Sequence, residues 1–83
     1  MVSGKNVDKR KPTDILLAVL ANNVKHLRKE KGLTQEGLGE VCDFHSTFIS
    51  LIERKQRNIT ISTLEIIANA LDVTPSELLQ EKG

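Results

Sequence analysis

Three threonines divide most of this chain into short helical segments. Thr34, Thr60 and Thr74 each precede an apolar run with helical spacing, and threonine is favoured immediately before the first turn of a helix. In the last segment Pro75 follows the threonine and Glu77 lies three residues after it, which is the pattern of a capping box. Helices this short are marginal alone, so they must be held by one another in a bundle.

The spacing of apolar residues predicts five helices and no strand. We expect four helices to span about residues 13–31, 34–42, 45–54 and 61–71, and a fifth helix to begin at Pro75. The side chains expected to face the core are Leu16, Leu20, Val24, Leu27, Leu38, Val41, Cys42, Ile49, Ile52, Leu64, Ile67, Ala68 and Leu71. Gly32 is expected to end the first helix in a left-handed conformation, and Asp43 and Phe44 to separate the second helix from the third. The predicted fold class is all-α, a compact five-helix domain over residues 13–83.

Length and composition limit the chain to one small domain. It has 83 residues, of which 39% are apolar, so its core is small and pairing with a second copy would add to its stability. The single cysteine, Cys42, excludes an internal disulfide and is interpreted as a small buried apolar residue. Residues 1–12 are polar and unpatterned, and we expect them to form a disordered basic tail.

No pattern in the sequence indicates export or membrane insertion. The longest apolar stretch, residues 15–21, is too short to span a bilayer. The N-terminus also lacks the pattern of a signal peptide. We therefore expect a cytoplasmic protein without a membrane partner.

Charge is distributed unevenly along the chain. Residues 1–31 carry eight Lys or Arg against three acids, whereas residues 32–53 carry four acids and no Lys or Arg. Arg54, Lys55 and Arg57 then form a basic cluster. This alternation fits a nucleic-acid footprint and fits an ordinary solvated surface equally well, so charge alone does not decide the function.

The second and third predicted helices suggest a helix-turn-helix unit over residues 34–54, because two short helices are joined by a turn of three or four residues. In such a unit the second helix projects one face into a DNA major groove about 12 Å wide. If Ile49 and Ile52 anchor that helix, the outward positions are Ser46, Thr47, Ser50, Leu51 and Arg54. Most of these side chains are short, so the helix could approach base edges closely.

The segment LRKEKGLTQEGLGEVCDFHSTFISLIERKQRNITISTLEIIANALDVTPSELL resembles the lambda-repressor/Cro-like, or Xre, helix-turn-helix family. The features that carry the resemblance are R..KGLTQ, FIS.IE and RN.TI.TLE.IA.AL.V.P.ELL, over about residues 24–79. Within that family the segment ERKQRNITISTLEII is similar to controller proteins of restriction–modification systems. The resemblance implies a lambda-repressor-like domain that binds specific double-stranded DNA, usually as a homodimer, without enzymatic activity.

The resemblance also implies roles for individual residues. Ser46, Thr47, Ser50 and Leu51 would face the bases. Gln35, His45, Arg54, Lys55, Arg57 and Asn58 would lie along the DNA backbone. Arg28 and Glu53 match a family pair that forms an ion pair between the first and third helices.

The sequence departs from the family pattern at several positions. Ser46 replaces an arginine of close relatives, which removes the commonest strong contact to guanine. Asp43 stands where the motif turn usually has a glycine, and because aspartate tolerates a left-handed backbone we expect this turn to be kept. Lys55 stands at a second position where glycine is usual, in the loop after the third helix. Gly37 replaces an acidic residue and Gly39 an alanine, and each glycine costs about 1 kcal/mol of helix propensity.

Other classes of function are disfavoured by the same residues. His26, Cys42 and His45 lack the spacing of zinc ligands, so no metal site is expected. No glycine-rich phosphate loop is present. A nucleophilic Ser46 or Ser50 would need a histidine as base and an acid that orients this histidine, and neither histidine has an evident partner of this kind. We expect no enzyme, no cofactor and no small-molecule ligand.

Two functions remain open from the sequence. The first is a dimeric transcription regulator on a pseudo-palindromic operator, and the second is an antitoxin-type or other protein-interaction module with secondary DNA binding. The residues predicted for the dimer interface are Val73, Leu78 and Leu79, in competition with an apolar surface of Ile15, Leu16 and Val19.

Overall fold

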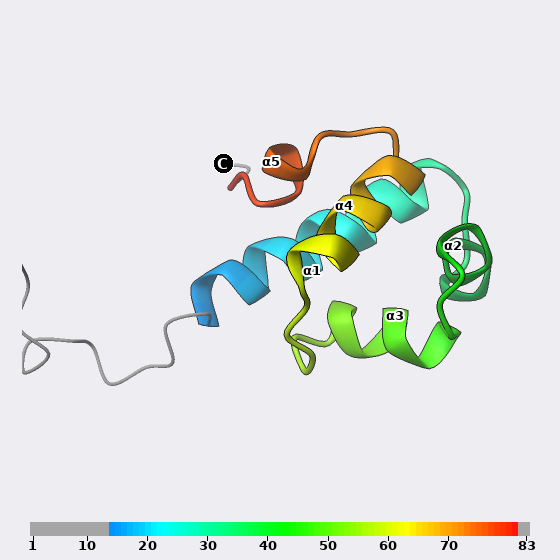
Figure 1. The fold of residues 1–83 in the computed structure, drawn as a ribbon, viewed down its shortest axis with the longest axis horizontal. Coiled ribbons are helices and arrows are strands. Elements are labelled where there is room, and N and C mark those ends of the chain that lie inside the picture. Colours follow the sequence, from blue (N-terminus) through cyan, green and yellow to red (C-terminus); the bar gives the residue numbers. More distant parts are fainter. Residues whose placement is uncertain (1–13, 82–83) are drawn as a thin grey trace, which may run out of the picture.

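The computed structural model describes residues 14–81, and within this range the chain forms helices and no strand. The helices are α1 (Asp14–Glu30), α2 (Gln35–Cys42), α3 (Ser46–Glu53), α4 (Ile61–Ala70) and α5 (Pro75–Leu78) (Figure 1). The predicted all-α class and the order of the elements are confirmed. The predicted tail, residues 1–12, lies outside the described residues.

The long helix α1 supports the other helices. It packs against α3 and α5, while α2 packs against α3 and α4, and α4 packs against α5. In the view of Figure 1, α3 lies along the lower edge of the molecule and α5 lies at its upper edge. The helix-turn-helix pair α2–α3 is therefore at the opposite side of the domain from α5.

Threonines begin three of the helices, as the sequence predicts. The hydroxyls of Thr34, Thr60 and Thr74 each accept a hydrogen bond from the backbone N–H three residues further on, at 2.9, 3.0 and 3.2 Å. The carboxylate of Glu77 accepts a hydrogen bond from the Thr74 N–H at 2.9 Å, which completes the predicted capping box. These bonds satisfy N–H groups that the first turn of a helix leaves without partners.

Each of the first four helices is followed, within two residues, by a residue in the left-handed conformation. These residues are Gly32, Asp43, Lys55 and Asp72, with φ between 60° and 71°. At each end, two N–H groups bond back to carbonyls of the last turn, as in a Schellman motif. Glycine adopts this backbone freely and the two aspartates tolerate it, whereas Lys55 carries a local cost of about 1–2 kcal/mol. Lys55 therefore has a backbone that favours glycine.

The core is aliphatic and receives side chains from all five helices. Its buried members are Leu20, Val24, Leu38, Cys42, Ile49, Ile52, Leu64, Ile67, Ala68, Leu71 and Leu78. Two residues predicted for the core are exposed instead, Leu16 at 49% and Val41 at 60%. Leu16 lies in the first turns of α1, which extend past the other helices (Figure 1). On the short helix α2 only the side of Leu38 and Cys42 meets the core, so Val41 is left in solvent.

A buried asparagine fastens α5 to α1. Asn23 is 5% exposed, and its side-chain Nδ2 donates to the carbonyls of Leu78 at 2.8 Å and Gln80 at 2.9 Å, with a longer contact of 3.4 Å to that of Glu77. These carbonyls belong to the end of α5, where the helix itself supplies no partners. No pattern in the sequence indicated this role for Asn23.

Gly39 marks a close approach between α2 and the turn that follows it. A Cβ atom at this position would lie 2.5 Å from the carbonyl oxygen of Phe44, which is too close for a real contact. We therefore expect Gly39→Ala to lower the free energy of unfolding by about 1–3 kcal/mol, although alanine is the better helix former. Gly37→Ala is the matched control, because its Cβ would meet only side-chain atoms, at 3.3 Å or more. Urea unfolding measures both, and equal stability of the two variants would contradict the close approach.

Candidate nucleic-acid interface

The turn between α2 and α3 sets the direction in which α3 leaves the core. Asp43 takes the left-handed conformation, and the Phe44 N–H bonds back to the carbonyl of Gly39 at 2.8 Å. His45 then begins α3, since its Nδ1 accepts a hydrogen bond from the Thr47 N–H at 3.1 Å. The imidazole therefore serves as an N-cap and lies exposed at the start of α3.

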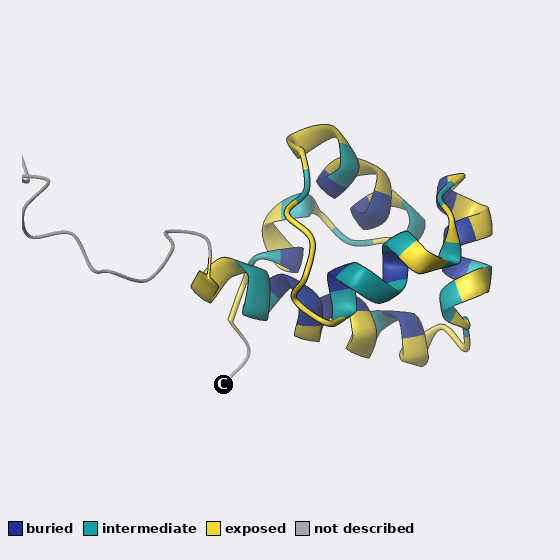
Figure 2. Ribbon diagram, turned by 90° about the horizontal axis from the view of Figure 1, so that it is seen from below, coloured by how far each residue is buried: buried dark blue, intermediate teal, exposed yellow. Residues whose placement is uncertain are grey.

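The helix α3 has one buried and one accessible side. Ile49 and Ile52 are 0% and 1% exposed, which anchors the helix as the sequence predicts. Thr47 is exposed, and Ser46, Ser50 and Leu51 are partly exposed. Figure 2 views the molecule from the side of α3 and shows the helix largely in the colours of partly buried and exposed residues. The predicted base-facing residues are thus all accessible on one face of α3.

An ion-pair network fixes α3 relative to α1. The guanidinium of Arg28 donates from Nε to Glu53 Oε2 at 2.6 Å and from Nη2 to Glu53 Oε1 at 3.0 Å. Its Nη1 donates to the carbonyl of Leu33 at 2.8 Å. The side chains of Arg28 and Glu53 are only 9% and 4% exposed. The structure therefore contains the ion pair that the resemblance implied.

The same network includes Gln35 at the start of α2. Its Nε2 donates to Glu53 Oε1 at 3.1 Å, so all three helices α1, α2 and α3 meet at one carboxylate. The hydrogen bond to Glu53, together with the attraction between the two charges, raises the pKa of Arg28 above its ordinary value, although burial acts in the opposite direction. Arg28 therefore stays charged and holds Glu53 in place.

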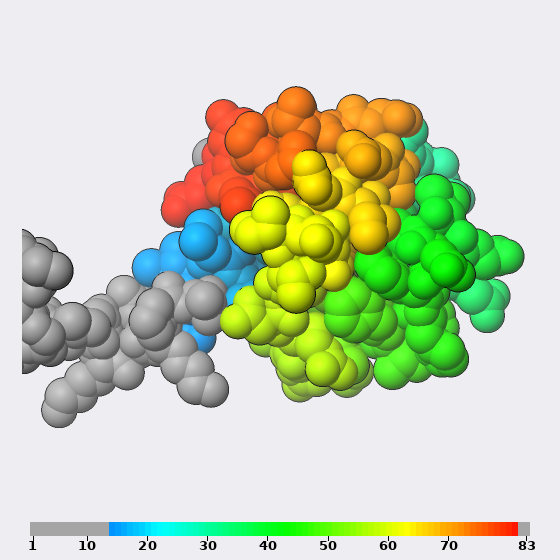
Figure 3. All heavy atoms as spheres, viewed as in Figure 1, coloured from blue at the N-terminus to red at the C-terminus, as the bar shows by residue number. Residues whose placement is uncertain are grey.

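The loop after α3 carries the basic cluster of the sequence. Arg54, Lys55, Arg57 and Asn58 are all exposed, and in the space-filling view this loop and α3 form the lower edge of the molecule (Figure 3). The Arg57 guanidinium lies over the ring of Phe48, with 5.9 Å between its Cζ and the ring centroid. Phe48 is partly buried and packs against the core.

The three residues predicted for the dimer interface differ in how far they are buried. Leu78 is fully buried in the core, so the prediction that it lines a contact with a second copy is wrong. It is covered because α5 rests on α1 and α4. Val73 and Leu79 are partly buried and pack against the core. The large apolar side chains with most exposure among residues 14–81 are Ile61, Val41, Ile15, Leu16 and Ile66.

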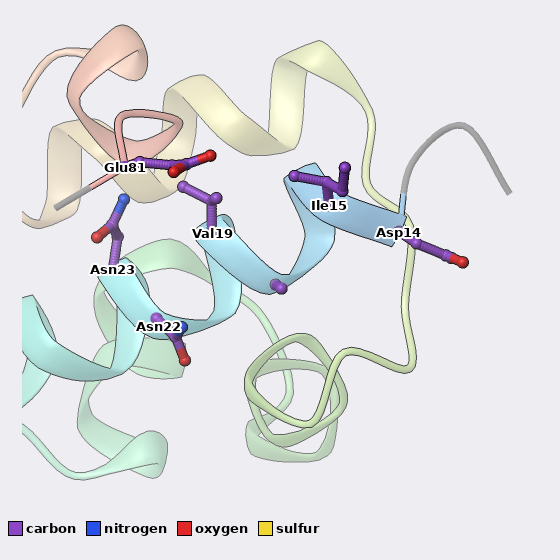
Figure 4. Close-up of a pocket in the computed structure, with 7 residues that line it drawn as sticks. Asp14, Ile15, Val19, Asn22, Asn23 and Glu81 are labelled. Atoms are coloured by element: carbon purple, nitrogen blue, oxygen red, sulfur yellow. The ribbon is translucent and has the colours of Figure 1, made fainter. Parts of the chain in front are cut away.

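A surface hollow of about 480 Å³ lies between the N-terminal half of α1 and the C-terminal segment, and no residue of α3 lines it. Its lining includes two carboxylates, Asp14 and Glu81, with Val19 and Ile15 between them in the close-up (Figure 4). The remaining lining residues are Ile15, Ala18, Val19, Asn22 and Asn23, none of which is a histidine, cysteine or serine.

Residues 14–81 contain no cluster of metal ligands, no activated thiol and no membrane-spanning helix. No group of three or more His, Cys, Asp or Glu side chains in this part of the chain could hold a metal ion. Burial raises the pKa of the Cys42 thiol, which keeps it protonated and a poor nucleophile. No helix in the described range is long and apolar enough to cross a membrane.

Comparison with known proteins gives consistent relatives. A helix-turn-helix family model matches residues 24–78. The control protein C.SmaI from Serratia marcescens is 45% identical over 65 residues, which cover 78% of this chain and 77% of that protein. The crystal structure of the hypothetical transcription factor NHTF from Neisseria superposes with a TM-score of 0.77 at 39% identity, covering 89% of this chain and 84% of that one.

A further relative was crystallised with DNA. The restriction-modification controller protein C.Esp1396I, in a tetramer in complex with its natural 35 base-pair operator, superposes with a TM-score of 0.69 at 41% identity. The match covers 76% of this chain and 83% of that one. These relatives are regulators and control proteins rather than enzymes. The chain therefore belongs to the helix-turn-helix family of DNA-binding transcription regulators, the Xre family, whose members include the controller proteins of restriction–modification systems.

Proposed function

We propose that this regulator binds a pseudo-palindromic operator as a homodimer, with α3 of each copy in a major groove. The observation that carries the proposal is the division of α3 into a buried side, with Ile49 and Ile52, and an accessible side that carries Thr47. A helix held in this way can enter a groove without disturbing the core. Two copies would then set their α3 helices about 34 Å apart, one turn of the duplex.

The accessible side of α3 would read the bases. Thr47 and Leu51 can contact thymine methyl groups, and the hydroxyls of Ser46 and Ser50 can each make a hydrogen bond. No arginine is present among these four residues, so direct readout is modest. The shape and deformability of the operator then contribute a larger share of the specificity.

The surrounding residues would hold the sugar–phosphate backbone. Arg54, Lys55, Arg57 and Asn58 form the loop beside α3, and His45 caps its start. Gln35 donates one of its two amide hydrogens to Glu53, so the second is available for a phosphate. Contacts of this kind fix the position of the protein on DNA but do not read its sequence.

The second copy would be held by the partly exposed residues Val73 and Leu79 near α5. C.Esp1396I was crystallised as a tetramer on its operator, which supports assembly of more than one copy on DNA. Selection of bound duplexes from a randomised pool, followed by footprinting, tests the proposal. We expect a two-fold symmetric site with half-sites about 10 base pairs apart. Recovery of no preferred sequence, or of an asymmetric single site, would count against it.

Removal of a backbone contact is expected to act on all DNA sequences alike. Arg57→Ala removes one cation from the loop, so it is expected to weaken binding to operator and to unrelated duplexes by a similar factor. It is also expected to make the dependence of affinity on salt less steep, by about one unit of the slope per copy and so about two units for the dimer. Gel shifts over a range of salt concentrations measure both effects. A change in operator preference alone would contradict a backbone role.

Removal of a base-facing methyl group is expected to change the preferred sequence instead. Thr47→Ala and Leu51→Ala each delete an apolar contact to a thymine methyl, so selection should lose its preference at one position of each half-site. The expected loss of discrimination is about 1–3 kcal/mol at that position. Identical selected sites for the wild type and both variants would place these side chains away from the bases.

A further inference from the structure

Phe48 and Arg57 form a contact that joins α3 to the loop behind it. The guanidinium carbon lies 5.9 Å from the ring centroid, which is within the range of a cation–π interaction. The two residues are nine positions apart, and neither belongs to the predicted base-facing set. The contact therefore has no role in the function as described so far.

The backbone of the loop brings the two side chains together. Lys55 takes the left-handed conformation, the Lys55 N–H bonds to the carbonyl of Ile52 at 3.0 Å, and the Gln56 N–H bonds to that of Leu51 at 2.8 Å. These bonds end α3 and reverse the chain. As a result, Arg57 returns alongside the helix that it follows.

The ring of Phe48 is itself held in place. It packs edge-to-face against Phe44, with ring centroids 5.1 Å apart and an angle of 74° between the planes. Both phenylalanines are partly buried and pack against the core. The platform under Arg57 is therefore fixed before any ligand arrives.

The contact leaves the hydrogen-bonding groups of Arg57 free. A guanidinium over an aromatic ring uses its π face, while its N–H donors lie in the plane of the group. Within residues 14–81 the Arg57 guanidinium makes no hydrogen bond or ion pair, and the residue is exposed. Its donors thus remain available for a phosphate.

We infer that Phe48 is a positioning residue for DNA binding, which holds Arg57 beside α3 so that the guanidinium meets a backbone phosphate already oriented. An arginine loses much rotational freedom when it is fixed. Because the ring restricts Arg57 in the free protein, less of this cost remains to be met on binding. The inference rests on the proposed function, since it assigns Arg57 to the DNA backbone.

A double-mutant cycle tests the inference on the intact protein. Phe48→Leu removes the ring and keeps an apolar side chain, and it is expected to weaken DNA binding about two- to fivefold. In the Arg57→Ala background the same change is expected to have no further effect, because the cation is already absent. Phe48→Tyr keeps the aromatic face and is expected to restore near-wild-type affinity. Equal losses in both backgrounds, or no loss in either, would overturn the inference.

Arg54 provides the matched control. It is an exposed arginine of the same loop without the ring contact, so Phe48→Leu and Arg54→Ala are expected to weaken binding independently. Coupling of Phe48 to both arginines would show a general distortion of α3 and reject the specific role.

A measurement without DNA separates this inference from the proposed function. The ring current of Phe48 is expected to shift the side-chain proton resonances of Arg57 in the free protein. The shift should vanish in Phe48→Leu and persist in Phe48→Tyr. If the shift follows this pattern but the wild type binds no DNA, the proposed function fails while the contact stands. If DNA is bound and the shift is absent, only the inference fails.

Discussion

Glu53→Ala is expected to lower the free energy of unfolding by about 3–5 kcal/mol, the largest effect of any single substitution considered for this domain. The change leaves the buried guanidinium of Arg28 without the carboxylate that receives two of its hydrogen bonds. It also removes the acceptor of the Gln35 amide. An unpaired charge at a site with 9% exposure cannot be compensated by water. Chemical unfolding monitored by circular dichroism measures the loss.

Two variants show whether burial of the Arg28–Glu53 pair is the cause of this loss of stability. Lys31 forms an ion pair with Asp72 in which the side chains are 36% and 75% exposed, so Lys31→Met is expected to cost no more than about 1 kcal/mol. The double variant Arg28→Met with Glu53→Met replaces both charges by apolar groups and is expected to recover much of the loss. Equal destabilisation by Glu53→Ala and Lys31→Met would show that the network does not depend on burial.

The network also has a functional consequence. Glu53 is the last residue of α3, and its partners belong to α1 and to the start of α2. Any weakening of this connection allows α3 to change its angle to α1 and α2, and with it the orientation of the side proposed to face DNA. A milder change such as Glu53→Gln is therefore expected to reduce operator affinity even where the protein remains folded.

Asn23→Ala is expected to lower the free energy of unfolding by about 2–3 kcal/mol. The side chain donates to the carbonyls of Leu78 and Gln80 at 2.8 and 2.9 Å, and the Leu78 carbonyl would be left buried without its side-chain donor. Asn22→Ala is the matched control, because Asn22 is the exposed neighbour on α1 and surface changes of this kind stay within about 0.5 kcal/mol.

Hydrogen exchange can locate the effect of Asn23→Ala. The amides of α5 are expected to lose protection first, because the variant releases this helix from α1 while the α2–α3 pair keeps its own packing. Uniform loss of protection across the domain would instead indicate that the asparagine supports the core as a whole. Because the proposed dimer residues Val73 and Leu79 flank α5, its release is also expected to weaken self-association.

Signals within a few residues of one another were sufficient to predict the secondary structure. The threonine caps, Gly32 and the spacing of Ile49 and Ile52 each act over one or two turns, where side chain and backbone meet in every compact fold. The resemblance to a known family added the Arg28–Glu53 pair. Local chemistry also allowed Asp43 to be assigned a left-handed backbone, because its short polar side chain tolerates that conformation.

The tertiary structure alone decided which apolar surfaces are covered and which polar groups lie inside. Leu16 and Val41 have the spacing of core residues yet are exposed, and Leu78 has the position of an interface residue yet is buried. The burial of Asn23 likewise joins segments 55 residues apart that no local pattern relates. Such features depend on where neighbouring helices end and how they cross, and the period of one helix carries no information about the length of another.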